Sequence, residues 1–196
     1  TVMGMSYMIY DDYDLLDEIV SDYAELQYQV AKRTLEVSTF KFDFAHYWED
    51  ICYKNGPLFS PDILTDLCAK HYKKRNDLVK SYGMDIVSLD CDGCIDQLIP
   101  LWLENGVNTM FPIEVGVWDA SIAPWREKYG SGLRGVGGMN KNVLSYDKKA
   151  VDEEIERLKP LIALGGYIPC PDHRLPPHTK FELVQYYTEK IKTVKI

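Results

Sequence analysis

The chain has 196 residues, 46% of them hydrophobic, so it is long and apolar enough to bury the core of one domain. Its 30 acidic residues outweigh 22 basic ones, and the net charge of −8 argues against binding to nucleic acid or to an anionic membrane. No apolar run could span a bilayer and the first residues lack a secretory signal pattern, so we expect a cytoplasmic protein. Five cysteines, an odd number, favour reduced thiols over a disulfide framework.

Helical and strand patterns alternate from the start of the chain. Apolar residues recur at helical spacing over 11–37 and predict a long amphipathic helix. The aromatic-rich run 42–48 predicts a strand that ends in Glu49-Asp50. Ser60-Pro61 is a typical helix start, and Gly83 is expected to end that helix.

The same strand-and-helix unit then repeats. Strands are expected at 84–89, 107–111, 133–136 and 167–169, and helices at 93–104, 119–129, 148–164 and 179–192. This alternation requires parallel strands and leaves two α/β folds open, a doubly wound sheet and a TIM (β/α)8 barrel. Five units do not close a barrel, and the chain begins without a methionine, so we expect about the last five βα units of a barrel.

Reactive side chains gather in two loops, 90–94 and 170–173, each of which follows an expected strand. Side chains at the carboxyl ends of strands are typical of α/β enzymes. Asp90 and Asp92 can point to the same side of their strand, and the loop with His173 would lie across the same mouth. Two carboxylates and an imidazole can bind zinc or another divalent metal, whereas the alternative is a solvated acidic loop in which Asp92 caps a helix.

Three cysteines lie in the same two loops. Cys91 and Cys94 form a C-x-x-C pair at an expected helix start, where the thiol pKa values would be lowered. Such a pair could be redox-active or, with Cys170, bind a thiophilic metal. A single C-x-x-C pair is a weak signal, so these cysteines are second-choice metal ligands.

Further polar residues stand at expected strand ends. Glu49, Asp50 and Glu114 are candidates for acid/base catalysis or for supporting a metal, although each could equally cap a loop. Arg174 could bind a substrate carboxylate in bidentate fashion or form an ordinary salt bridge. Tyr53 is the other candidate for substrate binding.

Several segments carry a resemblance to a known family. They are EDICYKNGPLFSP (49–61), DCDG (90–93), IPLWLENGVN (99–108), GGM (137–139) and GGYIP through PP (165–177). In this order they resemble the C-terminal half of the uroporphyrinogen decarboxylase superfamily. The resemblance implies that residues 1–196 are the C-terminal part of a single (β/α)8 barrel domain that lacks about three strands. The superfamily contains cofactor-free decarboxylases of porphyrin biosynthesis and zinc-dependent methyltransferases that move a methyl group between a corrinoid (cobalamin) and a thiol or related carrier.

The resemblance also implies roles for single residues. His173 matches a substrate-contacting histidine of the decarboxylases and a zinc-binding cysteine of the methyltransferases. Asp90 and Asp92 match the His and Cys of a His-x-Cys-Gly zinc motif, with Gly93 retained. Asp50 matches a decarboxylase serine that contacts the tetrapyrrole. The sequence therefore has the complete signature of neither branch.

These observations favour a corrinoid-linked, metal-assisted methyltransferase. Asp90, Asp92 and His173 would hold the metal, catalytic roles would fall to His173, Glu49, Asp50 and Glu114, and a partner protein would carry the corrinoid. The alternatives are a uroporphyrinogen decarboxylase, which needs no cofactor, and a non-catalytic corrinoid- or ligand-binding barrel. An incomplete barrel exposes apolar strand edges, so we also expect association, for example as a homodimer.

Overall fold

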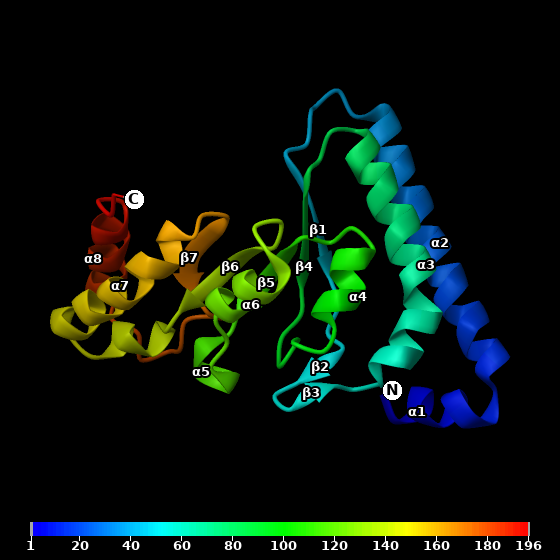
Figure 1. Cartoon of the computed structure of the whole chain (residues 1–196), viewed down its shortest axis with the longest axis horizontal. Helices are drawn as coiled ribbons and strands as arrows, with labels where there is room; N and C mark the ends of the chain where they lie inside the picture. Colours follow the sequence, from blue (N-terminus) through cyan, green and yellow to red (C-terminus); the bar gives the residue numbers. More distant parts are fainter. Residues whose placement is uncertain (1, 196) are drawn as a thin grey trace.

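The computed structural model describes residues 2–195 as a curved row of parallel strands with helices along its outer side (Figure 1). The strands of the main sheet are β1 (Phe44–Trp48), β4 (Ile86–Asp90), β5 (Thr109–Ile113), β6 (Arg134–Met139) and β7 (Tyr167–Pro171), and a hairpin is formed by β2 (Cys52–Tyr53) and β3 (Gly56–Pro57). The helices are α1 (Val2–Asp11), α2 (Tyr13–Val37), α3 (Pro61–Ser81), α4 (Ile99–Glu104), α5 (Val115–Trp118), α6 (Ile122–Tyr129), α7 (Lys148–Ala163) and α8 (Phe181–Ile191), with a 3-10 helix η1 (Lys141–Ser145).

The order of strands in the sheet follows the order in the chain, β1-β4-β5-β6-β7, and every pair is parallel. This confirms the predicted α/β alternation and is consistent with part of a TIM-like fold. Closure into a barrel is not seen. Within residues 2–195, β1 and β7 each have one edge that pairs with no further strand.

Three predicted helices differ from those observed. The helix expected over 11–37 is preceded by a separate α1, because Asp12 caps α2 by accepting a hydrogen bond from Leu15 N at 3.1 Å. The helix expected over 119–129 begins only at Ile122, because Ser121 caps α6 and Asp119, with a left-handed φ of 59°, ends the short α5 before it. The helix expected from residue 93 begins only at Ile99, and the preceding loop bonds instead to the hairpin.

The main core lies between the outer face of the sheet and the helices. Val87 and Met110 from the sheet are fully buried together with Trp102 of α4 and Leu158 of α7. Alternation along β4 places Val87 and Leu89 toward these helices and Ile86 toward the other face. Burial of this apolar surface is the main stabilising contribution to the fold.

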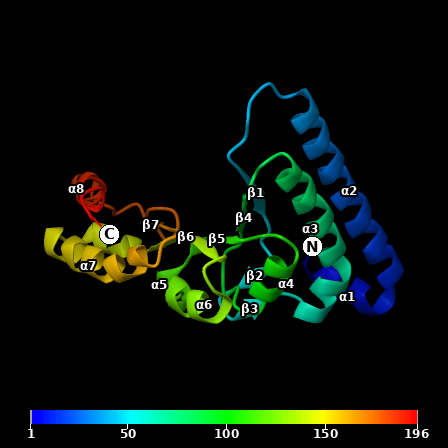
Figure 2. The same ribbon diagram turned by 45° about the horizontal axis from the view of Figure 1, so that its top comes forward.

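Among residues 2–195, no helix lies over the other, concave face of the sheet (Figure 2). A groove of about 720 Å³ crosses all five strands there, lined mostly by apolar side chains that include Phe44, Ile86 and Ile168. Phe44 is 57% exposed and Ile168 61%. None of the helices in the described part of the chain is long and apolar enough to cross a membrane.

Candidate metal centre

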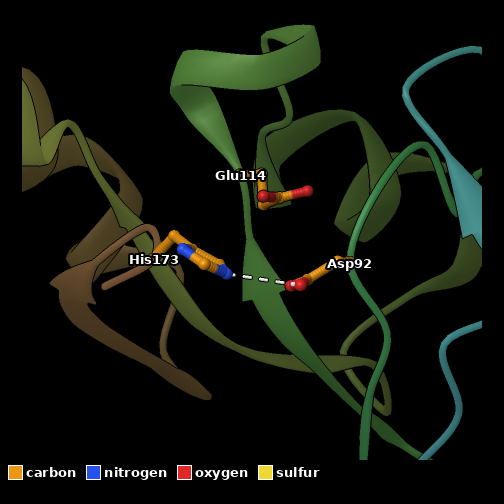
Figure 3. Close-up of side chains that lie close together, drawn as sticks. All are labelled: Asp92, Glu114 and His173. Carbon is orange, nitrogen blue, oxygen red and sulfur yellow. Dashed lines mark hydrogen bonds and ion pairs between the residues drawn. The ribbon is translucent and has the colours of Figure 1, made fainter. Parts of the chain in front are cut away.

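Three loops at the carboxyl end of the sheet bring Asp92, Glu114 and His173 together (Figure 3). One ligand atom from each lies within 4.8 Å of the other two. The ring Nε2 of His173 is 3.3 Å from Asp92 Oδ2, although 81 residues separate them in the sequence. The fold therefore joins the two loops that the sequence singled out and adds a carboxylate from a third.

The loop after β4 is held in place by a glycine. Gly93 N donates a hydrogen bond to Glu114 Oε2 at 2.6 Å, which fastens the Asp92 loop to the Glu114 loop. Gly93 has a φ of 91°, and a Cβ there would stand 2.7 Å from the carbonyl oxygen of Tyr53 in the hairpin. Only glycine fits both the backbone conformation and this close approach.

The three side chains differ in their exposure to solvent. Glu114, at the N-cap of α5, is only 4% exposed, whereas the side chains of His173 and Asp92 are 36% and 47% exposed. Burial raises the pKa of the Glu114 carboxyl above its ordinary value, with opposing contributions from the Gly93 N–H and His173 and a further rise from Asp92. The cluster thus has a buried wall and a side that remains open to a ligand.

The donor set suits a divalent metal. Two carboxylates and an imidazole are ligands that zinc accepts, and three protein ligands leave a coordination position for substrate. Zinc bonds to such atoms are about 2.0 to 2.2 Å long, so ligand atoms around a tetrahedral ion lie about 3.4 Å apart. Asp92 and His173 already have this spacing. The ligand atom of Glu114 lies within 4.8 Å of both.

Asp90, which we expected among the ligands, has a different partner. Its Oδ2 lies 3.8 Å from Nε2 of His46, whose Nδ1 is 3.3 Å from Ser88 Oγ. His46 and Ser88 are register partners on β1 and β4, and both line the concave groove. Burial, and next the repulsion by Asp92, raises the pKa of Asp90. Asp90 therefore lies beside the cluster and contributes to its electrostatics.

Glu49 and Asp50 turn out to lie in different surroundings. The Glu49 carboxylate is 3.9 Å from Arg75 Nη2, beneath helices α1 to α3, and burial raises its pKa. It therefore points away from the Asp92 cluster. Asp50 is exposed and close enough to Asp90 to raise the pKa of that group.

The two residues expected to bind substrate are both exposed. The Tyr53 residue is 66% exposed, and its backbone oxygen accepts a hydrogen bond from Cys94 N at 2.9 Å. Arg174 follows His173 directly and also faces solvent. Their positions leave substrate binding as a prediction.

The cysteines do not form a thiol site in the described residues. All five are free, and the metal-capable cluster found there contains none of them. Cys91 is fully buried, and hydrogen bonding to Cys52 together with burial raises the pKa of its thiol. Burial also raises the pKa of Cys170. The expected lowering of the Cys91 thiol pKa is wrong, because the pair precedes α4 by several residues and has no helix N-terminus beside it.

Two features of the site were not anticipated. Sequence reasoning gave Glu114 a role in catalysis or support, and the structure places it among the potential ligands. The sequence patterns gave no role to Asp172, which is completely buried next to His173. A carboxylate in a Pro-Asp-His loop carries no sequence signal of burial, because aspartate is usually a surface residue.

No protein-family model and no curated protein matches the chain. Among solved structures, the chain is similar to a methyltransferase from Methanosarcina mazei, with a TM-score of 0.73 at 18% sequence identity. The alignment covers 98% of this chain and 53% of the other, so the chain spans about half the length of that protein. At this identity the likeness concerns the fold.

Proposed function

We propose that the chain carries the metal centre of a corrinoid-linked methyltransferase of the uroporphyrinogen decarboxylase superfamily. The observation that carries the proposal is the convergence of Asp92, Glu114 and His173 at the carboxyl end of a parallel sheet. Ligand atoms gathered from three loops are what a catalytic metal site requires, and this end of the sheet is where such folds place their chemistry. The fold shared with a methyltransferase supports the same proposal.

Asp92, Glu114 and His173 would hold zinc or another divalent metal. When bound, the metal would supply Lewis-acid activation of a nucleophile such as a thiol. The nucleophile would give up a proton and receive the methyl group from a methylcorrinoid on a partner protein, whose carbon–cobalt bond would break with the electron pair left on the cobalt. Asp90 Oδ2 is suited to take that proton, because the pKa of Asp90 is raised and its carboxylate stands beside the cluster.

Metal titration of the full-length protein tests this proposal. Isothermal titration calorimetry and elemental analysis should find one zinc ion per chain in the wild type and a loss of that ion in His173→Ala. His71→Ala is the matched control, because His71 lies on α3 with its Nε2 3.2 Å from Ser21 and outside the cluster. Zinc binding should be unchanged in this control.

An activity measurement separates the reactions. Methyl transfer from methylcobalamin to a thiol should depend on zinc and on His173. Absence of zinc binding in the wild type would overturn the proposed metal centre. Turnover of uroporphyrinogen without metal would replace methyl transfer by decarboxylation.

A further inference from the structure

Asp172 is a fully buried carboxylate at the junction of three loops. Its Oδ2 accepts a hydrogen bond from Gly116 N at 2.8 Å, in the segment after β5. Its Oδ1 accepts from Lys141 N at 3.3 Å and lies 3.0 Å from Lys141 Nζ, after β6. Its own backbone N–H donates to Met139 O at 2.8 Å. The ends of β5, β6 and β7 are therefore fastened to one side chain.

Two members of the candidate metal centre depend on this junction. His173 follows Asp172 directly, and Glu114 lies two residues before Gly116. Glu114 in turn holds the Asp92 loop through its hydrogen bond with Gly93 N. Two hydrogen bonds and the short backbone segments between them thus connect Asp172 to the loops of all three potential ligands.

The charge of Asp172 is balanced within the same junction. The side chain of Lys141 is only 16% exposed and forms an ion pair with it. Buried ion pairs often stabilise a fold no more than apolar residues of similar volume would, so their contribution can lie in geometry instead. A charged carboxylate that accepts hydrogen bonds from two backbone N–H groups fixes the loops more tightly than an apolar contact could.

We infer that Asp172 is the positioning residue of the metal centre and that it sets the separation between His173 and Glu114. The inference rests on the proposed metal centre and adds the residue that organises it. Residues that orient metal ligands typically change metal affinity by about 10- to 100-fold when replaced.

The first measurement is a Co²⁺ titration followed by visible absorption. Asp172→Ala should weaken Co²⁺ binding by about 10- to 100-fold and alter the absorption bands of the bound ion. Asp172→Asn should weaken Co²⁺ binding less, because the amide oxygen of asparagine can still accept the hydrogen bond from Gly116 N. This partial rescue separates positioning from a mere loss of volume.

Glu154→Gln is the matched control. Glu154 is also a buried carboxylate with an ion pair, to Arg157 at 2.6 Å, and it accepts a hydrogen bond from Asn140 N. Within residues 2–195, the Glu154 carboxylate forms its hydrogen bonds with Asn140 and Arg157 and none with the loops of Glu114 or His173. Its replacement should leave Co²⁺ affinity within about twofold of the wild type.

Hydrogen exchange of the metal-free protein gives an independent readout. The amide of Gly116 should exchange faster in Asp172→Ala and at the wild-type rate in Glu154→Gln. If Asp172→Ala does not fold, Gly116→Ala replaces it, because the added methyl group would stand 3.2 Å from Asp172 Oδ2 and shift the carboxylate by a few tenths of an ångström.

These measurements test the metal centre and the positioning role of Asp172 separately. Wild-type protein that binds no Co²⁺ overturns the metal centre and the inference together. Normal Co²⁺ binding by Asp172→Ala overturns the inference alone, as does equal weakening in Glu154→Gln. Weakening confined to the Asp172 variants, with faster exchange at Gly116, supports it.

Discussion

The carboxyl end of the sheet and its concave face are built by opposite means. At the carboxyl end, hydrogen bonds among loops fix the positions of polar groups, as with Gly93 N on Glu114 and Gly116 N on Asp172. On the concave face, apolar side chains such as Phe44 and Ile168 lie exposed along a groove. The residues of the candidate site are thus organised within the described part of the chain, whereas the concave face has the composition of a surface that needs cover.

The largest expected change in the free energy of unfolding separates the covered face of the sheet from the open one. Leu158→Ala should lower the free energy of unfolding by about 2 to 5 kcal/mol, because Leu158 is fully buried. The matched truncation Ile168→Ala should change it by less than about 0.5 kcal/mol, because Ile168 is 61% exposed. Urea unfolding measures both. Similar losses in the two variants would mean that the concave face is covered in solution.

A smaller loss of stability is expected when the glycine beside the metal centre is replaced. Gly93→Ala should lower the free energy of unfolding by about 1 to 3 kcal/mol, because the new side chain would combine a positive φ with a clash against Tyr53 O. Gly83→Ala is a matched control, since Gly83 has a φ of 89° and no atom within 4 Å of the added methyl group. Thermal unfolding should show the larger loss for Gly93. Equal losses of stability in the two variants would mean that the backbone conformation alone causes them.

Association should reveal the exposed face. We expect the chain to associate with rising concentration, and Ile168→Lys should weaken that association by about tenfold, or about 1.4 kcal/mol. Leu164→Lys, at the C-cap of α7, is the control, because Leu164 is 40% exposed and is not among the groove residues. Sedimentation equilibrium measures the difference. A monomeric wild type at all concentrations contradicts this prediction.

The smallest expected effect is a pH dependence of stability at Glu49, which lies outside both regions. Burial raises the pKa of Glu49 above its ordinary value of 4.5, so the folded state binds this proton more tightly than the unfolded state does. Its contribution to stability is therefore fully present below 4.5 and is lost as the pH rises through the folded pKa. Glu49→Gln should flatten this part of the stability profile measured by urea unfolding. A steeper decline with pH in the variant would reverse the assigned sign.

Sequence patterns predicted the five strands of the main sheet because most of them are short, largely apolar runs with their own turn signals, whereas the two-residue strands of the hairpin were missed. They also placed Asp92 and His173 at the same end of the sheet, since parallel strands share a carboxyl edge. They could not predict that Asp90 would pair with His46, because that contact depends on the register between β1 and β4. The burial of Asp172 was equally inaccessible, since it depends on three loops that meet only in the folded chain.

The separation of 81 residues between Asp92 and His173 has a consequence for folding. The last strand must join the sheet before the two side chains can meet, so an unfolded chain has no preformed site. A metal that binds there would act as a reporter of complete folding. It would also add stability by mass action, about 2.7 kcal/mol at a free concentration 100 times its Kd.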